Sequence, residues 1–351
     1  MAKNFAPVVE LYDWVMMQKS KIAVSAALKA VLAKDAESFE FFKRDGRTIN
    51  MNAFLSKLIV NYSETFRTRR SALIERLKAE LFAALDIGDE RAEEIARGFV
   101  SRAMRLHFKD ADDKLCESVS VKPTDETRGI FRLIADNELK GSTFSEYFRG
   151  MFESYAQMPQ DEREKLIFAD GYKAIVAAIE KGKKIFVTTK RNSGKPVVLA
   201  PYAVVSSKEE MHCYLLATVK GKCRPFRLSR IASVFEIDEP ASFSDGQKNM
   251  FARMTAYAPQ YIYSDDEKEA VVELTDEGQK LFKALFVHRP LPTSVDGNVY
   301  RFNCSYMQLK QYFSSFGKEA YVREPAELRD IMARFHREAD AMYKERGMTK
   351  K

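Results

Sequence analysis

The sequence has few of the residues on which metal sites and disulfide frameworks depend. Its 351 residues include only four cysteines and four histidines. The cysteines, at positions 116, 213, 223 and 304, have neither metal-like nor disulfide-like spacing. No HxxxH or HxxE pattern joins any of the histidines, which are His107, His212, His288 and His336. We therefore expect a reduced protein that binds no metal and no cofactor.

Long apolar runs and nucleotide-binding motifs are also missing. No hydrophobic stretch approaches the roughly 18 residues of a membrane span, and no secretory signal is visible. Neither GxxxxGK[ST] nor GxGxxG occurs. Cys213 follows His212 directly, but neighbouring strand residues point to opposite faces, so the two are poorly placed as nucleophile and base. The sequence predicts a cytoplasmic protein that is not an enzyme and has no membrane partner.

Positive charge, by contrast, is present and concentrated. The chain has 57 Lys and Arg against 50 Asp and Glu, a net charge of +7. Between Gly171 and Phe235, thirteen Lys and Arg stand against three Glu, a surplus of ten positive charges, while the rest of the chain carries −3. A surplus confined to one region is typical of a binding site for a polyanion.

The first 165 residues contain a repeated pattern of strand, helix and helix. "KIAVSAAL" at 21–28 alternates polar and apolar residues, and "ESVSVKP" at 117–123 does the same. A shift of 93 residues aligns the apolar positions of the two second helices, and a shift of 97 aligns the strands. Any two amphipathic helices share an apolar stripe, but the shared order of elements favours a repeat.

This order resembles the ribbon-helix-helix fold, in which two units pair their strands into an antiparallel ribbon that enters a nucleic-acid groove. A lone strand would leave its backbone groups unpaired, so strands 19–25 and 118–122 are predicted to pair within the chain. Alternation turns one set inward, namely Ile22, Val24, Val119 and Val121. It turns another set outward, namely Lys19, Lys21, Ala23, Ser25, Ser118, Ser120 and Lys122. The three lysines are candidate nucleic-acid contacts; the alternative is a face that is merely solvated.

Residues 166–240 change to strands separated by turns. A short helix closed by Gly182 precedes "KKIFVTT", "PVVLAPYAVVSS", "MHCYLLATV" and "CRPFRLSRIASVFEID", which predict a small, strongly bent barrel. The pattern is similar to the WYL domain, an Sm-like barrel, with "APYAVV" (200–205) and "RPFRLSRI" (224–231) matching two of its segments. The triplet that names the family reads Cys213-Tyr214-Leu215 here, so no role of the missing Trp is carried over.

Arginine and tyrosine make up the candidate site of this domain. The planar fork of Arg binds phosphate and stacks on bases, and Tyr adds a ring face and a hydroxyl. The resemblance to WYL domains implies that this site binds nucleic acid or a nucleotide-like ligand. The candidate residues are Tyr202, Tyr214, Arg224, Arg227 and Arg230. The alternative is that Arg227 and Arg230 pair with acids of the C-terminal domain.

Residues 255–351, after a linker expected near 239–262, alternate strands and helices and predict an α+β sandwich. They resemble the C-terminal extension that often follows a WYL domain, through "FG" at 316–317 and "EPAELR" at 324–329. The last helix carries apolar residues at helical spacing, which favour a homodimer, although they could instead pack on their own sheet. These residues are Ile331, Met332, Phe335 and Met342.

The whole chain is thus predicted to be a multidomain α+β protein with domains at 1–165, 166–240 and 255–351. It resembles the WYL-domain accessory proteins of type VI-D CRISPR systems, in which a ribbon-helix-helix part precedes the WYL domain. That resemblance implies a non-catalytic partner that binds single-stranded RNA and enhances an RNA-guided RNA nuclease. The alternative is a transcription regulator that senses a ligand through its WYL domain and binds DNA through its ribbon.

Overall fold

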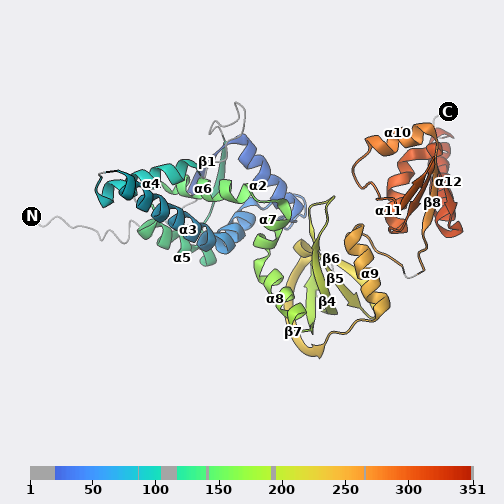
Figure 1. Cartoon of the computed structure of the whole chain (residues 1–351), viewed down its shortest axis with the longest axis horizontal. Coiled ribbons are helices and arrows are strands. Elements are labelled where there is room, and N and C mark those ends of the chain that lie inside the picture. Colours follow the sequence, from blue (N-terminus) through green and yellow to red (C-terminus); the bar gives the residue numbers. More distant parts are fainter. Residues whose placement is uncertain are drawn as a thin grey trace, which may run out of the picture. The chain divides into compact units, whose positions relative to one another are not determined.

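A computed structural model of the chain describes residues 20–85, 87–103, 117–139, 142–190, 195–264 and 266–348. It divides into two compact units, Met1–Ala169 and Asp170–Lys351. Both contain helices and antiparallel sheet (Figure 1), so the prediction of a multidomain α+β protein is confirmed. Lys19 lies outside the described residues.

The N-terminal unit contains two strands and a set of helices whose starts are capped by side chains. Ser25, Asn50, Thr124 and Thr143 each accept a hydrogen bond from a backbone N–H of the first helical turn, which satisfies donors that the helix itself cannot. The elements are β1 (Ser20–Val24), α2 (Ala26–Ser38), α3 (Met51–Ala84), α4 (Asp89–Ala103), β2 (Glu117–Val121), α5 (Asp125–Asn137), α6 (Phe144–Ala156) and α7 (Gln160–Ile167).

The predicted pairing of the two strands within one chain is confirmed. β1 and β2 run antiparallel, with Ile22 opposite Val119 and Lys21 opposite Ser120. The inward set is at most 4% exposed, as the alternation requires. Ser25, which was expected to face outward, is buried instead, because its side chain caps α2.

The two repeats protect each other's strands. Ser145, at the start of α6, accepts a hydrogen bond at Oγ from the backbone N–H of Ala23 in β1 (3.1 Å). Asn52, at the start of α3, accepts one at Oδ1 from the backbone N–H of Lys122, just after β2 (2.6 Å). Ser145 and Asn52 are 93 residues apart, which is the shift that aligns the repeated helices. The reciprocal contacts support the internal repeat.

A buried carboxylate joins three helices of this unit. Asp35 of α2 is fully buried and binds the guanidinium of Arg163 in α7 through two hydrogen bonds of 2.6 and 2.9 Å. Tyr155 of α6 donates its hydroxyl to the same carboxylate (2.8 Å). Burial raises the pKa of Tyr155 well above its ordinary value, so the phenol stays protonated and can donate.

We expect Asp35→Asn to lower the free energy of unfolding by about 3–5 kcal/mol. The amide keeps the shape of the side chain but leaves the largely buried Arg163 without its ionic partner, and a broken buried pair costs that much. Urea unfolding of the full chain, followed by circular dichroism, measures the change.

Glu117→Gln is the matched control, because it breaks the Lys29–Glu117 pair, whose side chains are 45% and 44% exposed. An exposed pair contributes about 0–1 kcal/mol. Equal effects of the two substitutions would show that the Asp35 cluster does not hold the helices together.

The C-terminal unit begins with helix α8 and a five-stranded antiparallel sheet in the order β6-β5-β4-β3-β7. In the described residues the outer strands β6 and β7 do not pair, so the sheet is open and the expected closed barrel is not formed. Pro225 lies on edge strand β6, where its missing N–H costs no ladder bond. The elements are α8 (Ala169–Glu180), β3 (Lys183–Thr189), β4 (Val197–Ser206), β5 (Cys213–Val219), β6 (Lys222–Arg227) and β7 (Ile231–Pro240).

Two expectations about this region were wrong. The run at 223–238 is not one strand, because a 3-10 turn at Leu228–Arg230 divides β6 from β7. The expected linker at 239–262 contains a helix, α9 (Asp245–Ala256), whose Met250, Phe251 and Met254 pack on Leu216 of β5.

The remaining residues alternate strands and helices in the predicted order. Their four strands form an antiparallel sheet, β11-β8-β10-β9, with Phe282, Phe302 and Phe313 in the core. The elements are β8 (Ala270–Leu274), α10 (Asp276–Ala284), β9 (Ser294–Asp296), β10 (Val299–Phe302), α11 (Tyr306–Phe313), β11 (Ala320–Glu324) and α12 (Ala326–Met348).

Candidate nucleic-acid interface

The strand register separates the predicted site residues onto two faces of the sheet. Tyr214 of β5 lies directly opposite Arg227 of β6, so these two side chains share a face. Arg224 is three residues before Arg227 on the same strand and therefore points to the other face. Arg230 lies in the 3-10 turn that follows. The five residues thus do not form one cluster, contrary to the sequence-based expectation.

Both predicted tyrosines are engaged within the protein. Tyr214 is 7% exposed and donates its hydroxyl to Glu210. Tyr202 stacks on Phe251 of α9, with centroids 4.4 Å apart and planes inclined by 17°, and it meets the edge of Phe243 at 5.2 Å. Tyr214 is thus enclosed, whereas Tyr202 is half-buried with one ring face against Phe251.

The arginines keep part of their surface accessible. Arg227 is half-buried, and its Nη2 lies 2.7 Å from Nε2 of His212. The same Nη2 lies 3.2 Å from Nδ1 of that ring. Arg224 is also half-buried and donates to the backbone carbonyl of Cys223 (2.9 Å).

A second group of lysine and arginine gathers where β3 ends. The backbone N–H of Lys190 donates to the carbonyl of Arg230 (3.0 Å), which brings the start of the β3–β4 connection to the 3-10 turn. Lys195, at the other side of that connection, is exposed. The backbones of Lys190 and Arg230 are therefore adjacent at this end of the sheet.

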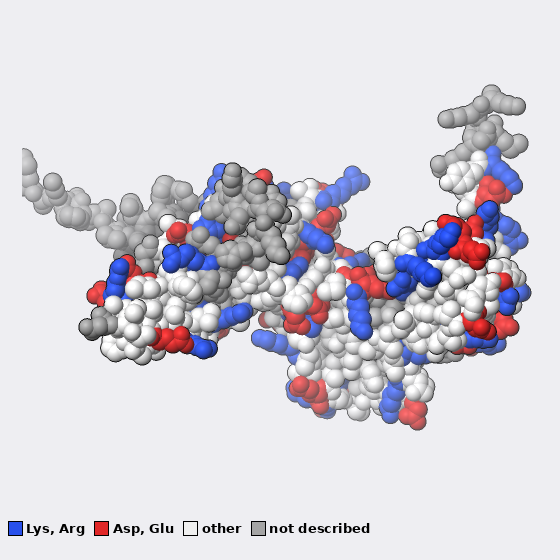
Figure 2. Space-filling model, turned by 45° about the horizontal axis from the view of Figure 1, so that its top comes forward, with Lys and Arg blue, Asp and Glu red and all other residues white. Residues whose placement is uncertain are grey.

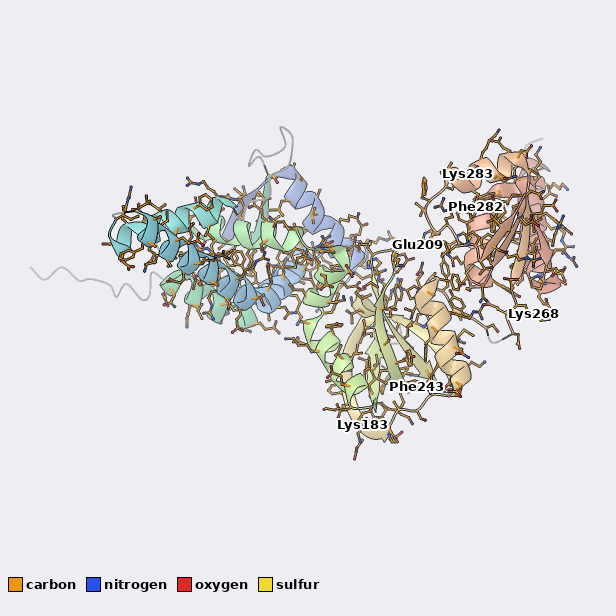
Figure 3. All side chains as sticks on the ribbon, viewed as in Figure 1. Lys183, Glu209, Phe243, Lys268, Phe282 and Lys283 are labelled. Atoms are coloured by element: carbon orange, nitrogen blue, oxygen red, sulfur yellow. The ribbon has the colours of Figure 1, made fainter. Side chains whose placement is uncertain are left out.

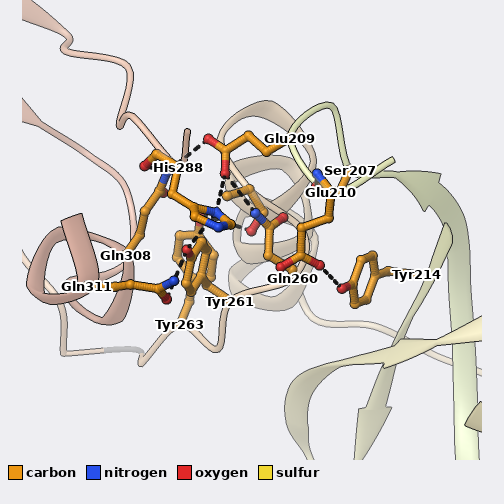
Figure 4. Close-up of polar contacts among 11 residues, drawn as sticks. Ser207, Glu209, Glu210, Tyr214, Gln260, Tyr261, Tyr263, His288, Gln308 and Gln311 are labelled. Carbon is orange, nitrogen blue, oxygen red and sulfur yellow. Dashed lines mark hydrogen bonds and ion pairs between the residues drawn. The ribbon is translucent and has the colours of Figure 1, made fainter. Parts of the chain in front are cut away.

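A polar cluster around Glu209 was not found from the sequence. Glu209, in the connection from β4 to β5, lies at the opposite end of the sheet from Lys183 and Phe243 (Figure 3). Its Oε2 is 3.2 Å from Nδ1 of His288 and accepts a hydrogen bond from Gln260 Nε2 at 3.0 Å (Figure 4). Burial raises the pKa of Glu209, and the bond to His288 opposes that rise.

This cluster bears on the alternative pairing considered for the arginines. The contact between the connection at 207–212 and the C-terminal part joins an acid of the former, Glu209, to His288 of the latter. This contact is a separate one, made by neither Arg227 nor Arg230. The partners are 79 residues apart, so no local spacing could have indicated them.

The ribbon offers a smaller basic surface. Lys21 and Lys122 are exposed at the outer side of the two strands. Lys29 and Glu117 form an ion pair of 2.8 Å beside them. Over the whole visible surface, Lys and Arg are interspersed with Asp and Glu rather than gathered into one large patch (Figure 2). Among the described residues on this face, Figure 2 shows no single extended basic patch.

Groups suited to metal binding or nucleophilic catalysis are scarce in the described ranges. No set of three His, Cys, Asp or Glu lies close enough there to hold a metal ion. Cys213, Cys223 and Cys304 are buried. Burial raises the pKa of Cys304 to about 12, so this thiol is protonated at neutral pH.

No helix among the described residues is long and apolar enough to cross a bilayer.

Comparison with known proteins finds a solved structure that is similar to this chain over most of its length. No protein-family model matches the chain, and no curated protein matches it. A crystal structure of a CRISPR Cas-related protein is similar over 94% of this chain and 95% of its own, with 20% identity and a TM-score of 0.62. At that identity the likeness shows a shared fold.

A second solved structure is the proteasome accessory factor B/C of Arthrobacter aurescens. It covers 63% of this chain and 37% of its own at 18% identity, and its TM-score of 0.23 carries no argument.

We expect Tyr202→Leu to lower the free energy of unfolding by about 1–3 kcal/mol, because it removes two aromatic pairs of about 0.5–1.5 kcal/mol each. Tyr202→Phe keeps the ring and is expected to change little. Thermal unfolding of both full-length variants measures this. A leucine variant of unchanged stability that loses nucleic-acid binding would restore the ligand role first expected of Tyr202.

Proposed function

We propose that this protein is a CRISPR-associated accessory protein that binds single-stranded RNA and enhances an RNA-guided RNA nuclease of the type VI-D class. The observation that carries the proposal is the likeness in fold to the CRISPR Cas-related structure, which spans nearly all of both chains. The proposal takes the protein to be non-catalytic and to act through binding.

The charge of the sheet in the C-terminal unit supports RNA as the ligand. The surplus of ten positive charges between 171 and 235 lies mainly on β3, β6 and the turns and connections around the strands. The lysines at 181, 183 and 184 pair with acids of β7, and the others contribute to the site. In this proposal Arg224, Arg227 and Arg230 bind phosphates of an RNA that passes around edge strand β6, because Arg224 and Arg227 lie on its two faces. Tyr202 and Tyr214 hold the sheet against α9 and the β4–β5 connection, and thereby support the arginines.

The order of elements supports the finer domain assignments that the proposal uses. A helix followed by five strands, with a short turn before the last, agrees with a WYL domain of Sm-like type. Paired strands from two strand-helix-helix repeats agree with a tandem ribbon-helix-helix region.

The ribbon favours a second candidate function, a DNA-binding regulator whose WYL domain senses a ligand. Lys21 is exposed on the outer face, and its opposite residue is Ser120. Lysine and serine on an antiparallel ribbon can contact phosphates and base edges. Binding assays at one salt concentration with single-stranded RNA, single-stranded DNA and duplex DNA separate the two. Preference for the duplex would favour the regulator.

We expect the double substitution Arg227→Ala with Arg230→Ala to weaken binding to a short unstructured RNA and to flatten its salt dependence. Each lost phosphate contact removes roughly 0.7 from the slope of log affinity against log salt for a single strand, so two contacts remove roughly 1.4. Fluorescence anisotropy over a salt series measures both effects, and a cleavage assay with the partner nuclease tests the functional consequence.

Arg301→Ala with Arg323→Ala is the charge-matched control. Both arginines pair with glutamates on the C-terminal sheet and are about half exposed. If the control and the test variant lose equal affinity, the effect is one of net charge, and the arginines of β6 and its turn are not the RNA site.

The last helix supports the proposal that the protein is a homodimer. Met332 packs in the core of its own domain, but Ile331, Phe335 and Met342 are 36%, 37% and 50% exposed. The expected apolar face of α12 is therefore divided between its own sheet and solvent. Three exposed apolar side chains on one helix are suited to an interface with a second copy.

We expect light scattering at micromolar concentration to give a mass of about twice 40.2 kDa. Ile331→Glu with Met342→Glu should reduce it to that of one chain, because a charge cannot be buried unpaired. Met307→Glu, at a 55% exposed position on α11, is the control and should leave the dimer intact. A wild-type mass of one chain would refute the proposed dimer.

A further inference from the structure

One row of apolar side chains crosses the outside of the sheet in the C-terminal unit. Phe186 of β3 lies directly opposite Val198 of β4 on one side and Phe235 of β7 on the other. The three residues are 38%, 41% and 64% exposed. Directly opposed residues share a face, so the row is continuous over three strands.

The helices of this unit leave that part of the face uncovered. α9 packs on the half of the sheet that contains Leu216 and Cys223, on β5 and β6. α8 lies against the other side, where Gly171 approaches Val234. Since Phe235 follows Val234 in the strand, its ring points away from α8. The row therefore lies on the face away from α8 and is exposed to solvent on β3, β4 and β7.

Phe186 and Phe235 differ from the other aromatic residues of this sheet. Tyr202 is stacked on Phe251, and Tyr214 is buried and bound to Glu210. Neither phenylalanine ring packs on another aromatic ring in the part of the chain that the structure describes. Tyr202 and Phe226 are half-buried, so Phe186 and Phe235 are the exposed aromatic rings of the described strands of this sheet.

The surroundings of the two rings suit a polyanionic chain. Thr188 and Ser233 form the next opposed pair on the same face, and their hydroxyl oxygens are 2.5 Å apart. Lys190 and Arg230 meet just beyond that pair. The three acids of β7 beyond Phe235, at positions 236, 238 and 239, each form an ion pair with a lysine, and so they repel a phosphate chain less.

We infer that Phe186 and Phe235 form a stacking platform for two bases of single-stranded RNA, with Lys190 and Arg230 beside the backbone. Sheets that bind single strands present exposed rings in this way, because every base has a ring face to offer. The inference rests on the proposed function and names the part of the surface that contacts bases. Val198 extends the apolar row at the edge of the platform.

A protein partner fits the row less well. A stable protein interface takes about 800 Å² from each partner, far more than three side chains supply. Two rings flanked by hydroxyl groups and cations match the size and charge of two nucleotides.

Fluorescence anisotropy with a labelled, unstructured RNA tests the platform in the full-length protein. We expect Phe186→Leu with Phe235→Leu to weaken binding at least fivefold and up to about a hundredfold for each base that loses its stack. The slope of log affinity against log salt should stay as in the wild type, since no phosphate contact is removed. Phe186→Tyr with Phe235→Tyr keeps both rings and should restore binding.

An RNA of the same length that carries abasic sites provides the decisive comparison. The wild type should bind it as weakly as the leucine variant does, and the leucine variant should lose little further affinity. An equal loss for both proteins would show that the rings do not stack on bases and would overturn the platform. Leucine variants that bind normal RNA as the wild type does would overturn it as well.

Two further outcomes separate this inference from the function on which it rests. A wild-type protein that binds no single-stranded RNA refutes both. If wild type binds RNA and only the arginine variant weakens it, the proposed function stands and the platform is refuted. A leucine variant whose mass in light scattering falls from two chains to one shows that the row is an interface between copies, which also refutes the platform.

Discussion

The N-terminal unit depends on backbone hydrogen bonds between two strands that lie almost a hundred residues apart. In the described residues β1 and β2 have only each other as sheet partners. A buried strand with unpaired N–H and C=O groups is strongly unfavourable, so neither repeat could form its core alone. Their pairing places Ile22 and Val119 over the helices, and α3 and α6 then bond to the strand of the other repeat. In the same unit, the ion pair between Asp35 and Arg163 joins α7 to α2.

The parts of the fold that follow from a regular period could be predicted from sequence. Alternation identified both ribbon strands, and the common shift identified their helices. The 3-10 turn at Leu228–Arg230 could not be recognised in the sequence. Leu228 and Ile231 on either side of it are both buried, so the apolar residues continue across the turn as they would in one strand. Helix α9 could have been predicted, because Met250 and Met254 are four residues apart, which is helical spacing. They lie in the segment that was expected to be a linker.

The candidate site was less accessible to sequence reasoning, because its availability depends on contacts between distant residues. Composition showed in which segment the Lys and Arg residues are concentrated. It could not show that Tyr202 is covered by Phe251 or that Tyr214 is held by Glu210, and these contacts decide which rings a ligand can reach. The exposed Phe186 lies between buried neighbours in a strand whose pattern reads simply as apolar. Tertiary packing decides which face of a sheet a helix covers, and it therefore also decides which aromatic rings remain accessible to a ligand.

The joining of both ribbon strands in a single polypeptide has a consequence for symmetry. A ribbon made by two identical chains must present every outward side chain twice, related by a two-fold axis. Its ligand is therefore contacted by the same side chains in two equivalent halves. Here Lys21 opposes Ser120, and Ala23 opposes Ser118. One mutation changes one half alone, so each strand can diverge independently of the other. The outer face of this ribbon is consequently a directional surface, on which a ligand bound in one orientation meets different side chains from a ligand that is reversed.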